Sequence, residues 1–367
     1  MIMNSRSRLV CPAAGCRNML PARGHRQRLQ FWGKWGVLLT AAFGFLAAGG
    51  LSFAAQQTQQ IRTARQTPFP KKPDWSKLEV ETLHVQGQVH LIAGAGGNIA
   101  VQTGPSSVLV VDSGYEQMSS KVLAAIRKLS DKPIRTIINT TLMESHTGGN
   151  AALVKAGAAL QGGPGVGQRP NEGDLIGHSK LLALMTEIGR DKIPVERWPP
   201  SVFSGKQKDL YSNDEPVIIL HVPNAVTAGD SMVWFRKSDV IVTGEIFNQA
   251  SFPFIDVEHG GTINGIIEGL NTLLDMMVPK HNQEGGTMVI PGYGRIGDEH
   301  DVLEYRDMVT IIRDRVQAYM KKGMTLQQIK ALKPSPTYEY EPRFNRDPDW
   351  TAEMFVEAIY KNLSVAK

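Results

Sequence analysis

The feature that most constrains this chain is the segment from Asn139 to Asn150, which reads Asn-Thr-Thr-Leu-Met-Glu-Ser-His-Thr-Gly-Gly-Asn. It directly follows a short run rich in β-branched residues, Ile134 to Ile138, and this composition predicts a strand. The polar segment would then begin at the carboxyl end of this strand. Related strand-end motifs occur elsewhere in the chain, so the segment has to be interpreted together with them.

The other motifs are Val-Val-Asp112-Ser-Gly, Pro223-Asn-Ala-Val-Thr-Ala-Gly-Asp230, Val-Thr-Gly-Glu245-Ile-Phe and Val-Ile-Pro-Gly-Tyr293-Gly. In this order they resemble the motifs of the metallo-β-lactamase superfamily, over roughly residues 80 to 300. That family's loop reads Asn-Thr-His-x-His-x-Asp-His-x-Gly-Gly-Asn. Its frame survives at Asn139, Thr140, His146, Gly148, Gly149 and Asn150.

Most positions that hold metal in the family are replaced in this chain. The resemblance implies a first metal site at Thr141, Met143 and Val226, and a second at Ser145, His146 and Tyr293, with Glu245 at the bridging carboxylate. It also implies structural roles beside the site for Asp112, Asn150 and Asp230.

The replacements predict that no metal is bound. A catalytic zinc needs three protein ligands and an open position for water, whereas His146 and Glu245 are the ordinary ligands left here. Met143 and Val226 are apolar and can fill the vacated space as core residues do. We expect Glu245 to pair with His146 or with the hydroxyl of Tyr293, because an unpaired buried carboxylate is costly. Met143 and Val226 should pack beside that pair.

Two functions follow from this interpretation. The first is an exported pseudoenzyme without a cofactor, which binds a small molecule or an active paralogue. The alternative is a divergent hydrolase of esters, lactams or phosphoesters, with a single zinc or a rebuilt site around His146, Glu245 and a recruited residue such as His221 or Tyr293. Its substrate choice would lie in the variable loops from Gly162 to Ser212.

The positive charge of the chain is concentrated at its N-terminus. Residues 1–55 contain seven Lys and Arg and no acidic residue, which leaves a net charge of −2 for residues 56–367. That balance argues against nucleic acid as a partner. Residues 35–55 carry no charge, which predicts a cleaved signal peptide or a membrane anchor. We therefore expect a periplasmic or secreted body, with membrane contact through this segment alone. Both cysteines, Cys11 and Cys16, precede it.

The predicted organisation is a leader at 1–55, a linker at 56–78 and one metallo-β-lactamase-like domain at 79–367. Short strands precede and alternate with helices, so the chain is α/β or α+β. The resemblance implies a four-layer αββα sandwich with C-terminal helices. Expected strands are 89–93, 99–102, 107–112, 134–138, 217–221, 232–235, 240–243 and 287–290. Expected helices are 121–129, 263–278, 302–322, 326–331 and 351–362.

Overall fold

The computed structural model describes residues 73–157, 173–335 and 350–365. The expected leader, most of the expected linker and the first part of the variable loops lie outside the described residues. Every helix in the described part of the chain is too short or too polar to span a bilayer. The predicted domain boundaries at residues 55 and 78 stay predictions.

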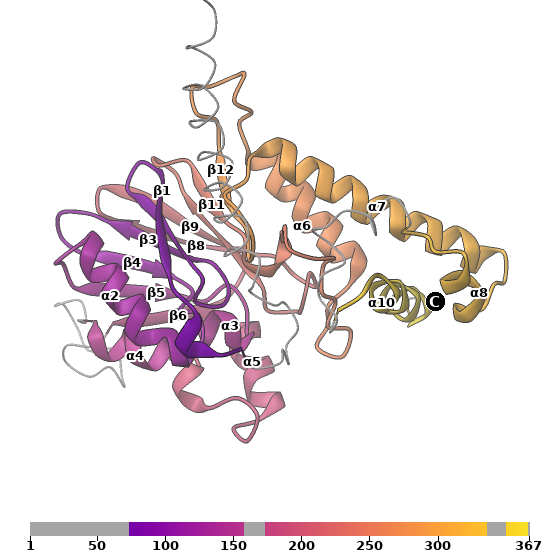
Figure 1. Cartoon of the computed structure of the whole chain (residues 1–367), viewed down its shortest axis with the longest axis horizontal. Helices are drawn as coiled ribbons and strands as arrows, with labels where there is room; N and C mark the ends of the chain where they lie inside the picture. Colours follow the sequence, from indigo (N-terminus) through magenta and orange to yellow (C-terminus); the bar gives the residue numbers. More distant parts are fainter. Residues whose placement is uncertain (1–72, 158–172, 336–349, 366–367) are drawn as a thin grey trace, which may run out of the picture. The chain divides into compact units, whose positions relative to one another are not determined.

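The first sheet has seven strands that follow the order of the sequence (Figure 1). They are β1 (Glu81–Gln86), β2 (Val89–Ala93), β3 (Ile99–Thr103), β4 (Val108–Val111), β5 (Ile134–Ile138), β6 (Asp174–His178) and β7 (Ser201–Phe203). Neighbouring strands from β1 to β4 are antiparallel, and those from β4 to β7 are parallel. Parallel neighbours need crossover connections, and helices occupy each of these crossovers.

The second sheet has five strands in the order β12, β11, β10, β9 and β8. Their bounds are β8 (Gln207–Ser212), β9 (Glu215–His221), β10 (Ser231–Phe235), β11 (Val240–Val242) and β12 (Met288–Ile290). The strands from β8 to β11 are antiparallel, whereas β11 and β12 are parallel. The chain between β11 and β12 contains the long helix α6.

The helices have the following bounds. They are α2 (Ser119–Leu129), α3 (Glu144–Thr147), α4 (Asn150–Ala156), α5 (Ser179–Ile188), α6 (Ile263–Met276), α7 (Glu299–Lys321), α8 (Leu326–Ala331) and α10 (Ala352–Val365), with short 3-10 turns at Trp75–Lys77, Glu116–Met118, Val195–Arg197 and Gly244–Ile246. Helix α7 begins before the predicted residue 302, because Asp298 and Asp301 form a reciprocal capping box that satisfies amide groups of the first turn.

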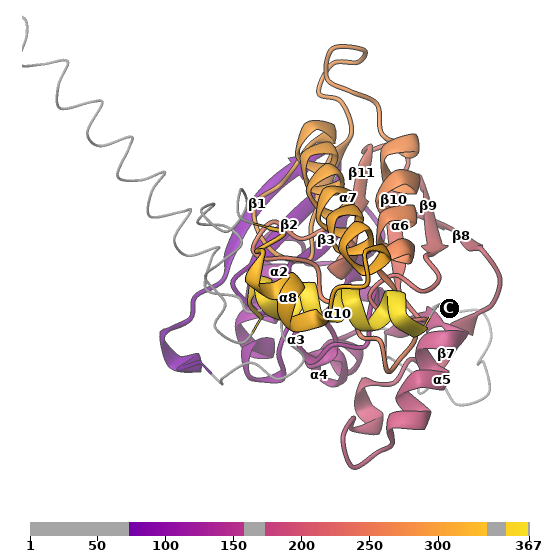
Figure 2. The same cartoon turned by 90° about the vertical axis from the view of Figure 1, so that its right-hand side faces the viewer.

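Three apolar clusters define four layers. The two sheets pack face to face through residues that include Leu91, Ile138, Ile219 and Phe235. Helices α2 and α4 cover the outer face of the first sheet, and α6, α7 and α10 form the core on the outer side of the second (Figures 1 and 2). The expected four-layer sandwich with C-terminal helices is confirmed. Burial of one face of each helix against a sheet supplies the hydrophobic stabilisation.

Candidate functional site

The family motifs meet where several strands end. Asp112 follows β4, the polar loop follows β5, Glu245 follows β11 and Tyr293 follows β12. Because β4 pairs with β5 in parallel and β11 pairs with β12 in parallel, each pair brings two motifs to the same edge of its sheet. Asp112 adopts a φ of 63°, a left-handed conformation that is uncommon for residues other than glycine.

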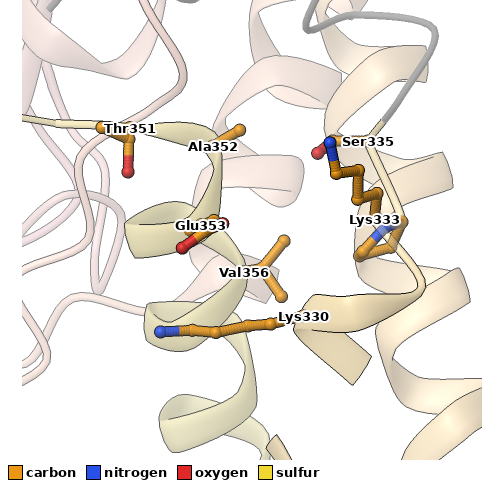
Figure 3. A pocket seen from close by; sticks show the side chains of 8 residues that line it. Lys330, Lys333, Ser335, Thr351, Ala352, Glu353 and Val356 are labelled. Atoms are coloured by element: carbon orange, nitrogen blue, oxygen red, sulfur yellow. The ribbon is translucent and has the colours of Figure 1, made fainter. Parts of the chain in front are cut away.

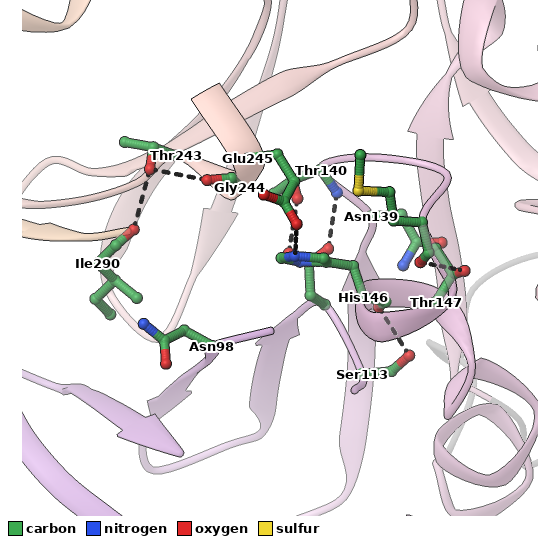
Figure 4. Close-up of polar contacts among 12 residues, drawn as sticks. Asn98, Ser113, Asn139, Thr140, His146, Thr147, Thr243, Gly244, Glu245 and Ile290 are labelled. Atoms are coloured by element: carbon green, nitrogen blue, oxygen red, sulfur yellow. Dashed lines mark hydrogen bonds and ion pairs between the residues drawn. The ribbon is translucent and has the colours of Figure 1, made fainter. Parts of the chain in front are cut away.

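His146 lies at the centre of this meeting point, with its side chain fully buried (Figure 4). Its Nδ1 is 2.8 Å from Oδ2 of Asp112, and its Nε2 is 3.0 Å from Oε1 of Glu245. The predicted pairing of Glu245 with His146 is therefore present. Asp112 contacts the same ring, so both ring nitrogens have a carboxylate partner. The sequence did not predict this second contact.

The remaining oxygens of the two carboxylates also have donors. The backbone N–H of Thr140 donates to Oδ1 of Asp112 at 2.9 Å, and its hydroxyl donates to Oδ2 at 2.6 Å. The side-chain amide of Asn248 donates to Oε2 of Glu245 at 3.0 Å. Burial of both charges is thus compensated by hydrogen bonds as well as by His146.

Electrostatics favours a protonated imidazole at His146. Burial lowers the pKa of this ring, but the carboxylates of Asp112 and Glu245 outweigh that effect and raise it to about 10. At neutral pH the imidazolium donates one N–H to each carboxylate. The positive charge of this imidazolium therefore lies between the two buried carboxylates.

The part of the loop that matches the family's motif forms a structural network. Asn139 and Asn150 exchange amide hydrogen bonds at 3.1 and 2.8 Å, and Ser113 donates to Asn150 at 2.8 Å. A Cβ at Gly149 would lie 2.4 Å from the carbonyl oxygen of Ser113, so only glycine permits this close approach. The frame thus holds the loop in place through contacts that need no metal.

The replaced positions are also buried. Thr141 and Val226 are fully buried, and Met143 and Ser145 are 3% and 4% exposed. Burial raises the pKa of Asp230 to about 7, although hydrogen bonds from Thr227 oppose this. Its Oδ1 and the hydroxyl of Thr141 have no hydrogen-bond partner of good geometry among the described residues. The three first-site positions, Thr141, Met143 and Val226, are thus held by side chains that are neutral or apolar.

Tyr293 lies beside His146 without hydrogen bonding to it. The two rings meet edge to face, with centroids 5.7 Å apart. The Tyr293 hydroxyl has no hydrogen-bond partner of good geometry among the described residues, and burial raises the pKa of Tyr293 well above its ordinary value. A phenol that stays protonated is a poor ligand for zinc, so Tyr293 does not complete a metal site.

The residues present do not fit the family's metal centre. Across the described ranges, no group of three or more His, Cys, Asp or Glu side chains is arranged to hold a metal ion. His221, named as a possible recruited ligand, does not join His146 and Glu245 in such a group. Its Nε2 is 3.0 Å from the carbonyl oxygen of Ala228, and its ring stacks on His178 at 3.6 Å. The expectation that His221 could rebuild the site is therefore wrong.

A cavity of about 840 Å³ opens beside the polar loop. Residues 142–144 form part of its wall, together with Arg197, residues 254–259 and the start of α10. Apolar side chains such as Ile255, Trp350 and Met354 line it alongside charged ones. No sequence pattern indicated Arg197, because it lies in a 3-10 turn far along the chain from the loop. Its guanidinium donates to the hydroxyl of Thr147 and to the carbonyl of Leu142.

A smaller cavity of about 260 Å³ lies away from these motifs, between α8 and the first turns of α10 (Figure 3). Lys330, Lys333, Glu353 and Val356 contribute to its wall. Lys330 is already paired with Glu357 at 2.5 Å. The cavity beside the polar loop is therefore the better candidate for a ligand site.

Comparisons with known proteins agree with the fold. The sequence model of the metallo-beta-lactamase superfamily matches residues 93–317. A linear primary-alkylsulfatase from Pseudomonas sp. (strain ATCC 19151) is 26% identical over 293 residues, which are 70% of this chain and 54% of that protein. The chain thus spans about half the length of this curated relative.

Solved structures show the same architecture at low sequence identity. The stereoselective inverting sec-alkylsulfatase Pisa1 from Pseudomonas sp. aligns with a TM-score of 0.58 at 12% identity, covering 77% of this chain and 50% of that one. A double mutant of the same sulfatase aligns with a TM-score of 0.59, also at 12% identity, covering 90% of this chain and 63% of that one. Identity this low supports the shared fold alone.

Proposed function

This chain belongs to the metallo-beta-lactamase superfamily, and we propose that it is a pseudoenzyme with respect to that family's metal chemistry, acting by binding an amphiphilic small molecule in the cavity beside the polar loop. Superfamily members such as the matched alkylsulfatase are hydrolases.

One observation carries the proposal. His146 is fully buried, and both of its ring nitrogens are engaged by Asp112 and Glu245. A metal at the second-site position would have to displace the proton between His146 and Glu245, and it would then meet Ser145 and Tyr293 where two further ligands belong. Without a bound metal there is no water of low pKa and no Lewis acid at this position.

The walls of the cavity support a small molecule, rather than a paralogue, as the bound partner. A volume of about 840 Å³ lies in the range of small-molecule sites. Apolar walls suit an alkyl chain. Arg197 lines the same cavity and forms no ion pair with a carboxylate among the described residues, so it can bind an anionic head group. The matched relative is named for its action on primary alkyl sulfates, which combine these two features.

Titration calorimetry with decyl sulfate, decanoate and decanol tests the binding. Met354 is 41% exposed and lines the cavity, whereas Ile311, 38% exposed on α7, does not. We expect Met354→Glu to weaken binding of decyl sulfate at least tenfold, about 1.4 kcal/mol, and Ile311→Glu to leave it unchanged. Equal effects of both variants, or no binding to the wild type, would reject the site.

A second variant tests whether the charge of Arg197 binds the head group. Arg197→Gln places an amide nitrogen where the Arg Nε donates to Thr147, but it removes the charge. It should therefore reduce binding of decyl sulfate and decanoate more than binding of decanol. Thermal unfolding of each variant shows whether the fold is retained. Equal losses for all three ligands would argue that Arg197 acts on the fold rather than on the head group.

We also propose that the body is exported, because of the basic and then uncharged sequence of residues 1–55. N-terminal sequencing of the protein purified from its native compartment tests this. A start near Ala55 or Gln56 indicates a cleaved signal peptide, and a full-length chain in the membrane fraction indicates an anchor. A full-length chain in the cytoplasm would contradict export.

The alternative, a divergent hydrolase, is favoured by the alkylsulfatase relative. It requires His146 and Glu245 to hold a metal or to act on substrate. Release of sulfate from decyl sulfate, and hydrolysis of ester, lactam and phosphoester substrates, should be measured with and without a chelator, for the wild type and for His146→Ala. Activity that both treatments abolish would establish the alternative, and activity that neither changes would exclude it.

A further inference from the structure

A second histidine with a carboxylate partner lies in the wall of the same cavity. Nδ1 of His259 is 2.7 Å from Oδ2 of Asp256, and both residues line the cavity beside the polar loop. The His259 side chain is 27% exposed, and no described group forms a hydrogen bond with its Nε2. A carboxylate at Nδ1 fixes the tautomer that leaves Nε2 as a free acceptor.

The backbone around this pair is firmly held. The N–H of Asp256 donates to the carbonyl of Val226 at 2.9 Å, and the carbonyl of His259 accepts from Ala228 at 3.0 Å. A Cβ at Gly261 would lie 2.0 Å from the carbonyl oxygen of Val226, so the turn packs directly against that loop. The pair is thus anchored to the segment that contributes a metal ligand in the family. Such anchoring provides the preorganisation that an acid–base group needs.

We infer that His259, oriented by Asp256, is a metal-independent acid–base group for a carboxylic ester bound in this cavity. Its Nε2 takes a proton from a water molecule as the water oxygen attacks the ester carbonyl carbon, and the carbonyl π electrons move to the carbonyl oxygen. The tetrahedral intermediate then collapses, and its carbon–oxygen bond to the alkoxide breaks. The imidazolium returns the proton to the alkoxide. Ester and water give acid and alcohol, with no oxidation or reduction.

This inference rests on the cavity being the ligand site, and it adds a slow hydrolysis to the proposed binding. The pair is independent of the buried contacts of His146, because His146 is fully enclosed whereas His259 reaches the cavity. Asp256 is a positioning residue in this scheme, and His259 is the catalytic one.

The test measures hydrolysis of 4-nitrophenyl octanoate by protein stored in EDTA. A positioned general base contributes on the order of 100-fold or more in rate. We therefore expect His259→Gln to lower kcat/KM by about 100-fold and Asp256→Asn by about tenfold. His300 is the matched control, because it also faces a carboxylate, Glu304 at 3.4 Å, but lies on the exposed side of α7. His300→Gln should hydrolyse the ester at the wild-type rate.

A second variant, His259→Asn, keeps the inference testable if His259→Gln fails to fold. It removes the same ring nitrogens and should also lower kcat/KM by about 100-fold. A wild-type rate in either folded variant, or equal losses in His300→Gln, would overturn the inference. Decyl sulfate binding is measured on the same samples. Binding without hydrolysis rejects the acid–base role alone, and absent binding rejects the ligand site itself.

Discussion

Replacing His146 with leucine should strongly destabilise the fold. The substitution removes one buried cation and leaves two carboxylates, Asp112 and Glu245, that are 0% and 2% exposed. Breaking a buried ion pair by removing one partner costs about 3–5 kcal/mol, a large share of the roughly 5–15 kcal/mol that stabilises a typical domain. The double variant His146→Leu with Glu245→Leu should recover part of this loss, because one of the stranded charges is removed with its partner.

Urea unfolding at pH 7 measures these free energies, and a double-mutant cycle gives the coupling between His146 and Glu245. His300→Leu is the control, since its pair with Glu304 is exposed and contributes about 1 kcal/mol or less. A loss of less than about 1 kcal/mol for His146→Leu, comparable with the control, would refute the argument that the imidazolium balances two buried carboxylates.

Three other predictions concern histidines and their neighbours. Burial, followed by the charge of His221, lowers the pKa of His178 to about 4. Its contribution to stability is therefore present above about pH 6.5 and is lost as pH falls toward 4, so His178→Phe should flatten the acid limb of a plot of unfolding free energy against pH. The pKa of His146 is raised to about 10, so its contribution is complete below about pH 6.5 and is lost as pH rises through 10; a wild-type urea midpoint that stays constant from pH 7 to 10.5 would contradict this. A Cβ at Gly97 would lie 2.4 Å from the His146 ring, so Gly97→Ala should lower the free energy of unfolding by about 1–3 kcal/mol, measured by the same urea titration.

Much of the fold could be predicted from the sequence, because apolar strands and ordered motifs carry strong local signals. The strands around the site and the helices α6 to α10 lie close to their expected ranges. Strand β8 escaped prediction because Gln207 to Ser212 is polar, with residues that alternate between exposed and half-buried at the edge of a sheet. Strand β7 is too short to give a periodic pattern.

The site was predictable in part for the same reason. Motifs at neighbouring strand ends had to converge, and this placed Glu245 beside His146. Asp112, which contacts His146, has a left-handed backbone conformation. No local sequence pattern predicts that conformation or the contact. His221 looked available in the sequence, but its stacking on His178 brings together the ends of two different sheets. Contacts of this kind are set by tertiary packing.

Metal analysis of the purified protein tests the central claim most directly. The protein should be prepared without chelators, supplied with zinc, iron and manganese, desalted and measured by mass spectrometry of the elements. The combined variant Thr141→His, Met143→His, Ser145→Asp and Val226→His restores the family's residues at those positions and is the positive control. We expect the wild type to retain well under one equivalent of any of these metals and to unfold at the same temperature with and without EDTA. Tight binding of one or more equivalents by the wild type would contradict the claim that a buried imidazolium has replaced the metal.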